Sequence, residues 1–96
     1  MKIISTQDVI EGSWEENKET KVIKEKYLKE YNLLMGLKDK NMTKKIALTV
    51  IIILLIEKEH KDLLGELVLI IKKAKKFIKN ETKITYENLL KECGIK

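Results

Sequence analysis

The most regular pattern in the chain is an apolar block over residues 46–56, interrupted only by Thr49 and bordered by charged residues on both sides. A membrane-spanning helix needs about 20 apolar residues, so this block is too short to cross a bilayer. Residues 49–53 are β-branched and favour a strand, but a typical strand has only about five or six residues. A helix that is apolar all round belongs inside a core. The pattern therefore predicts a buried helix over 44–59, capped by Thr43.

A second hydrophobic pattern, with spacings of three and four, predicts one helix over residues 18–35 that ends at Gly36. Its apolar face is formed by Ile23, Tyr27, Tyr31 and Leu34 and widened by Leu28 and Met35. The only tryptophan, Trp14, lies in the connection before this helix. We expect it to plug one end of the core.

The C-terminal half carries two further helical patterns. The segment 61–79 has one apolar stripe and one lysine stripe. A last short helix over 84–92 is predicted to begin at Thr82 or Thr85 and to end at Gly94. A capping pattern also predicts a helical turn over 5–11. The fold class is therefore all-α: four main helices and a short N-terminal helical turn, around the buried helix 44–59. The short connections predict antiparallel consecutive helices.

Length and composition indicate one domain over residues 1–96. The chain opens without a signal peptide, and we expect it to be a helical domain excised from a longer protein. Its single cysteine, Cys93, excludes an intrachain disulfide, which is typical of a reducing compartment and predicts a cytoplasmic protein. The oligomeric state does not follow from the sequence.

Candidate catalytic chemistry is sparse. His60 is the only histidine, and we find no cluster of Cys, Asp or Glu with metal-ligand spacing around it. Cys93 lacks a neighbouring base in the sequence, which a nucleophile needs. We therefore expect no catalytic residue, no cofactor and no metal, and a protein that is not an enzyme.

Lysines at positions 72, 75, 76 and 79 form the basic stripe of the segment 61–79. Three interpretations remain open: a solvated face, a surface for an acidic partner protein, or a surface that binds nucleic acid or an anionic membrane. All 20 basic residues are lysine, and the net charge is +5. Nucleic acid is the less favoured partner because arginine, the residue that best reads guanine edges, is absent.

Two leucines fall away from the apolar faces of their helices. Leu33 and Leu69 are both predicted to be exposed, and exposed apolar residues on charged faces are typical of interfaces. The candidate partner-binding residues are therefore Leu33, Leu69, Lys72, Lys75, Lys76 and Lys79.

The order of motifs resembles the C-terminal helical module of proteins that combine a vault-protein inter-alpha-trypsin (VIT) domain with a von Willebrand factor A domain. The resemblance covers residues 5–80 and is carried by Gln7…Gly12-Ser13-Trp14-Glu15, the apolar helix, and Leu67…Lys72-Lys73-Ala74-Lys75-Lys76-Phe77-Ile78. That family includes the vault poly(ADP-ribose) polymerase, whose C-terminal segment binds the major vault protein. The last helix is less familiar from the family.

These observations predict a non-enzymatic protein–protein interaction module. The resemblance implies the major vault protein, or a similar intracellular assembly, as its docking partner. The alternative is a small lysine-rich helical protein that binds nucleic acid non-specifically through the Lys72–Lys79 face.

Overall fold

The central helix has the bounds that the hydrophobic pattern predicts. In the computed structural model, α3 runs over Lys44–Glu59, and every residue from 46 to 56 is buried. Thr43 begins the helix, because its side-chain oxygen accepts a hydrogen bond from the Ile46 N–H at 3.3 Å. Thr49 is the one polar residue of the block, and its hydroxyl donates to the Lys45 carbonyl at 2.8 Å. This bond satisfies the hydroxyl inside the core.

The structure describes residues 14, 18–37, 42–63, 65 and 67–95. This part of the chain forms five α-helices and one 3₁₀ helix and contains no strand, which confirms the all-α prediction for the described residues. The helical turn predicted over 5–11 lies outside them. The radius of gyration is 12.1 Å, close to the value of about 12.5 Å typical of a folded chain of this length.

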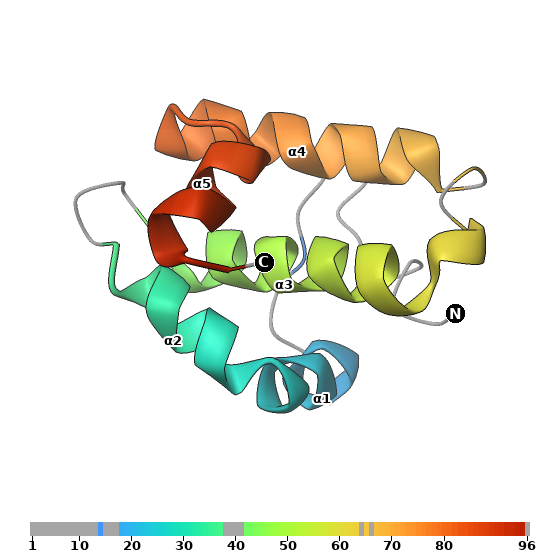
Figure 1. Ribbon diagram of the computed structural model, residues 1–96, viewed down its shortest axis with the longest axis horizontal. Coiled ribbons are helices and arrows are strands. Elements are labelled where there is room, and N and C mark those ends of the chain that lie inside the picture. The colour runs from blue at the N-terminus through green and yellow to red at the C-terminus, as the bar shows by residue number, and fades with distance from the viewer. Residues whose placement is uncertain (1–13, 15–17, 38–41, 64, 66, 96) are drawn as a thin grey trace.

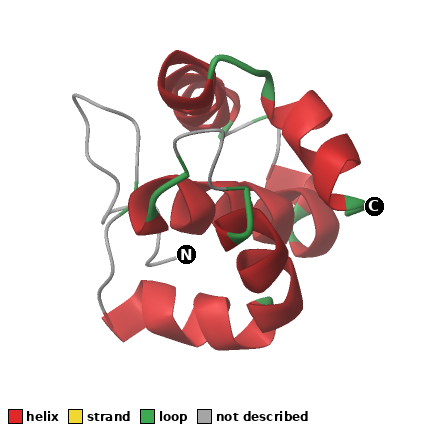
Figure 2. Ribbon diagram, turned by 90° about the vertical axis from the view of Figure 1, so that its left-hand side faces the viewer, coloured by secondary structure: helices red, strands yellow, loops and turns green. Residues whose placement is uncertain are grey.

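The helices are arranged in layers around α3 (Figure 1). The helix α4 (Val68–Thr82) covers one side and runs antiparallel to α3, whereas α1 (Lys18–Lys26) and α2 (Leu28–Met35) cover the other. The view turned by 90° shows the same order of layers (Figure 2). The last helix, α5 (Tyr86–Cys93), packs against both α2 and α4 and so joins the two outer layers.

The prediction of one helix over residues 18–35 is wrong, because the chain bends at Tyr27 and separates α1 from α2. Tyr27 has φ −112° and ψ 35°, outside the helical region. The Tyr27 N–H still donates to the Ile23 carbonyl at 3.0 Å, and the Tyr31 N–H to the Tyr27 carbonyl at 2.9 Å. The helical hydrogen bonding is thus nearly continuous across the bend. No glycine or proline stands at this position in the sequence.

The bounds of the next helix also differ from the prediction of 61–79. A short 3₁₀ helix, η3, occupies Lys61–Leu63, and α4 begins only at Val68. Gly65 lies between them, and glycine is a poor helix former. At the other end α4 continues to Thr82, whose buried hydroxyl donates to the Ile78 carbonyl at 2.7 Å.

The last helix runs over Tyr86–Cys93 rather than the predicted 84–92. Of the two predicted N-caps, Thr85 takes the role, since its hydroxyl accepts a hydrogen bond from the Asn88 N–H at 3.3 Å. Gly94 ends the helix in the left-handed conformation, with φ 70°, as predicted.

The core contains the aromatic residue expected to close it. Trp14 is fully buried, and its backbone N–H donates to the Thr49 hydroxyl at 3.2 Å. Its burial confirms a core position, and its partner lies in the N-terminal half of α3.

Candidate functional site

Two opposite faces of α4 explain why this helix presents charge to the solvent. Its apolar residues Ile71, Ala74, Phe77 and Ile78 are buried. The opposite side of the helix carries five exposed residues, which lie within a sector of about 100° around the helix axis if each residue turns the helix by about 100°. We call this surface the α4 outer face: Val68, Leu69, Lys72, Lys76 and Lys79.

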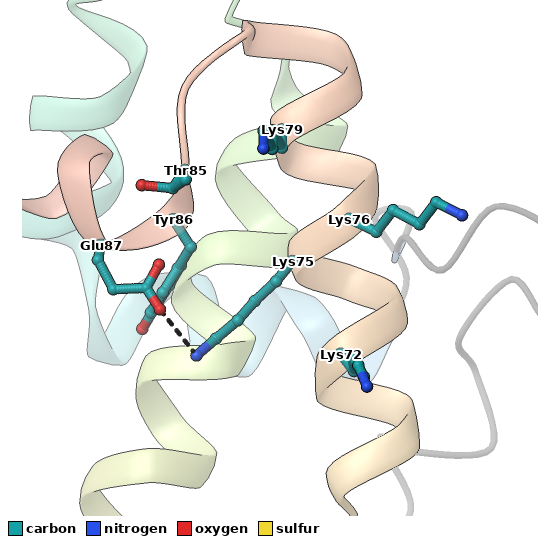
Figure 3. Close-up of a pocket in the computed structure, with 7 residues that line it drawn as sticks. All are labelled: Lys72, Lys75, Lys76, Lys79, Thr85, Tyr86 and Glu87. Carbon is teal, nitrogen blue, oxygen red and sulfur yellow. Dashed lines mark hydrogen bonds and ion pairs between the residues drawn. The ribbon is translucent and has the colours of Figure 1, made fainter.

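A pocket lies between α4 and the start of α5 (Figure 3). Its volume is ≈ 260 Å³, far above the ~10–15 Å³ that holds one water molecule. Four lysines of α4 and the first residues of α5 meet here because α4 and α5 pack against each other. The lining residues are Lys72, Lys75, Lys76, Lys79, Thr85, Tyr86 and Glu87. We call this the α4–α5 pocket.

Lys75 differs from the other lysines of the stripe because its charge is neutralised within the fold. Its Nζ lies 3.5 Å from Glu57 Oε2 and 3.3 Å from Glu87 Oε1. The same ammonium lies 4.9 Å from the centre of the Tyr86 ring, at cation–π distance. That Lys75 binds a partner stays a prediction, but its ammonium is already engaged in these two ion pairs. It links α3, α4 and α5.

Lys72, Lys76 and Lys79 are exposed and have no ion pair with any described residue. Figure 3 shows the Lys75 side chain reaching toward Glu87 and the Lys76 side chain pointing away from it. These three cations carry the positive potential of the α4 outer face.

Tyr86 forms the apolar wall of the pocket, although its hydroxyl is turned to another partner. The buried Tyr86 donates its O–H to Glu57 Oε1 at 2.8 Å. Burial raises the pKa of this phenol strongly, and the Glu57 carboxylate adds to the effect. Tyr86 therefore remains protonated and serves as a donor. Sequence reasoning missed Glu57, and the only signal for it was its position directly after the apolar block.

Glu87 brings a carboxylate into the pocket. Its pKa is lowered by a hydrogen bond from its own backbone N–H, by the charge of Lys75 and by a hydrogen bond from that lysine, although desolvation opposes these effects. The site therefore holds one ionised internal anion beside Lys72, Lys76 and Lys79, which have no ion pair among the residues that the structure describes.

The exposed leucines are confirmed as exposed but do not form one surface. Leu69 is 77% exposed and Leu33 41% exposed. Leu33 lies on α2, on the opposite side of α3 from α4 (Figure 1). Sequence reasoning missed Val68, which is exposed next to Leu69, and placed Leu28 on the apolar face although its side chain is exposed.

His60 and Cys93, the two residues considered for catalysis, lie at a helix end and at a half-buried position. His60 ends α3, and its backbone N–H donates to the Ile56 carbonyl at 3.0 Å. Cys93 is half-buried, and burial raises the pKa of its thiol, with a further contribution from Glu92. A raised pKa lowers the fraction of reactive thiolate. Among the described residues no group of His, Cys, Asp and Glu side chains has the arrangement of a metal site.

Within the described residues, no helix has the length and hydrophobicity required to cross a membrane. No family model, curated protein or solved structure matches this chain. The similarity to the C-terminal module of VIT and von Willebrand factor A proteins stays a prediction.

Proposed function

We propose that this domain is a non-enzymatic interaction module that docks an acidic segment of a partner protein on the α4 outer face. The observation that carries the proposal is the position of Leu69, 77% exposed, on the same face as three lysines that form no ion pair with the described part of the chain. A surface of this composition suits a segment that has apolar side chains beside carboxylates.

The apolar end of the face supplies the binding energy in this proposal. Burying a fully exposed Leu or Val side chain contributes roughly 1.5–3 kcal/mol. Val68 is 54% and Leu69 77% exposed, so much of this contribution is available to a partner. Small apolar centres surrounded by polar groups are typical of interface hot spots.

The lysines act mainly on the rate of association. Lys72, Lys76 and Lys79 attract an acidic segment over a distance comparable to the Debye length of about 8 Å at physiological salt. Such steering accelerates association and weakens as salt rises.

Nucleic acid is the second candidate, because the three exposed lysines of this face can contact successive phosphates. The adjacent Leu69 and Val68 favour a protein, since they offer nothing to a phosphate backbone. The family resemblance makes the major vault protein the first natural partner to test, in a cytoplasmic setting.

The test compares binding of two synthetic helical peptides to the full chain. One peptide is acidic with an apolar stripe, and the other has the same stripe with lysines in place of glutamates. We expect saturable binding of the acidic peptide only, with amide shifts on α4 in two-dimensional NMR spectra. Purified major vault protein and a random DNA duplex are measured in parallel, the latter over a range of salt concentrations.

Variants of the face separate anchoring from steering. Leu69→Glu should leave the fold intact and abolish peptide binding, whereas the matched control Leu33→Glu should bind normally. The double variant Lys72→Glu/Lys76→Glu should slow association and reduce its salt dependence. Equal binding of the acidic and basic peptides contradicts the proposal, as does full affinity in a folded Leu69→Glu variant. Tight duplex binding with a steep loss of affinity at higher salt favours nucleic acid instead.

A further inference from the structure

We infer that the α4–α5 pocket receives a phosphoryl group carried on a side chain of the docked partner. This inference rests on the proposed function, since it assigns a chemistry to the partner at the edge of the same face. The pocket opens beside the α4 outer face, and Lys72, Lys76 and Lys79 belong to both.

The first argument is the distribution of charge within the pocket. Lys75 divides its ammonium between the carboxylates of Glu57 and Glu87, at 3.5 and 3.3 Å. Lys72 precedes Lys75 by three residues and Lys79 follows it by four, so both lie on the same side of the helix. Neither has an ion pair with a described residue. The walls therefore attract more negative charge than the fold itself supplies.

The second argument is the internal anion. The Glu87 carboxylate already occupies the α5 side of the pocket, where Lys75 and its own N–H hold it (Figure 3). A carboxylate from a partner would bring one negative charge and two acceptor oxygens. A phosphoryl group carries a charge of about −1.5 to −2 at neutral pH and three acceptor oxygens. It can therefore contact more than one ammonium at once.

The third argument is the kind of cation that is present. Lysine binds phosphate as a point charge and does not need the planar fork of arginine. Thr85 also lines the pocket, but its hydroxyl caps α5 by accepting from the Asn88 N–H and points away from the lysines in Figure 3. The pocket volume of ≈ 260 Å³ leaves room for the group and for hydrating water.

The test measures binding of small probes to the full chain by NMR, at constant ionic strength. The probes are N-acetyl-O-phosphoserine amide and N-acetylaspartate amide. We expect saturable shifts of the amides of Thr85, Tyr86 and Glu87 with the phosphoserine probe. Its affinity should exceed that of the aspartate probe by at least about fivefold, because the dianion engages more than one lysine.

Three variants test the assignment of the pocket. Glu87→Gln removes the internal competitor and should tighten phosphoserine binding about twofold to fivefold, as one exposed charge contact allows. Lys72→Gln/Lys79→Gln should weaken it about threefold to tenfold. Lys29→Gln serves as the matched control, because Lys29 is an exposed lysine on α2 outside the pocket, and it should leave the affinity unchanged.

The inference is overturned if the aspartate probe binds as well as the phosphoserine probe, or if the Lys29→Gln variant loses as much affinity as the pocket variant. It is also overturned if Glu87→Gln weakens binding. Neither probe needs Leu69, so a failure of peptide docking with intact probe binding refutes the docking proposal and leaves the pocket as a phosphoryl site without that partner. Conversely, peptide docking without preference for a phosphorylated serine refutes only the inference about the pocket.

Discussion

Ile52 offers the most direct test of the fold, because it lies in the middle of α3 and has no exposed surface. Ile52→Ala removes three carbon atoms, which costs about 2.4 kcal/mol in transfer free energy at about 0.8 kcal/mol per buried methylene. Helical layers on both sides of α3 limit the collapse of the resulting cavity, which adds to the cost. We expect a total loss of about 3–4 kcal/mol and, for Ile52→Val, a loss of about 1 kcal/mol.

These losses are large against the stability of a domain of this size. A chain of 96 residues has a free energy of unfolding of about 5–14 kcal/mol, at about 0.05–0.15 kcal/mol per residue. The alanine variant should therefore fold with reduced stability. Ile52→Asp should not fold, since an unpaired carboxylate in the core costs several kcal/mol more.

Urea unfolding followed by circular dichroism and by the fluorescence of Trp14 measures these effects. Trp14 is fully buried, so its emission should be blue-shifted and weakly quenched by acrylamide in the native state. The two signals should change together if unfolding is two-state. Leu69→Ala is the control, because a substitution at a position 77% exposed should change stability by at most about 0.5 kcal/mol. A loss below about 1 kcal/mol for Ile52→Ala, or an unchanged melting midpoint for Ile52→Asp, would show that α3 is not buried.

Two further predictions concern the ends of α4 and α5. Gly94 and Lys83 both have left-handed backbones, with φ 70° and 68°. Gly94→Ala should therefore cost about 1 kcal/mol, whereas Lys83→Gly should be neutral or stabilising by up to about 1 kcal/mol, since relief of strain exceeds the added entropy of the unfolded chain. Denaturant titration checks both, and an equal loss for the two variants would contradict the assignment at Lys83. The pKa of Glu87 is lowered in the folded state, mainly by a hydrogen bond from the Glu87 backbone N–H and then by the charge of Lys75. The ionised Glu87 side chain therefore stabilises the fold at pH values above its unfolded pKa of about 4.3. This stabilisation disappears as the pH falls through the pKa of Glu87 in the folded state. The small difference in unfolding free energy between the native chain and Glu87→Gln at pH about 7 should therefore vanish near pH about 2. A difference that persists at the lower pH would exclude ionisation of Glu87 as its source.

Short-range sequence patterns predicted the buried central helix and several helix ends correctly, because these features depend on neighbouring residues along the chain. The apolar block and its flanking charges gave α3 its observed bounds, and the residue types Thr43, Thr85 and Gly94 marked helix ends. The bend at Tyr27 escaped prediction because the hydrophobic spacing continues through it and neither glycine nor proline stands there. The late start of α4 escaped because the apolar stripe also continues across Gly65.

The candidate site was only partly predictable, since its residues come together through tertiary packing. The lysine stripe and the exposure of Leu69 follow from helical spacing alone. Nothing in that spacing shows that Lys75 turns inward to Glu57 and Glu87, because these residues come from two other helices. The meeting of α4 with the start of α5, which creates the pocket, is a property of the whole fold.

A helix that is apolar on every side has no preferred rotation about its own axis, since each orientation buries nearly the same surface. In α3, polar contacts at its C-terminal end and at Thr49 can supply that preference. Glu57 accepts from Tyr86 on α5 and Glu59 accepts from Tyr27 at the α1–α2 bend, at 2.8 and 2.5 Å. These two glutamates project about 160° apart on the helix, and Thr49 binds the Trp14 backbone from a third direction. We expect these three contacts to set the angular register of α3, so that a small number of polar atoms select one packing among several of similar hydrophobic energy.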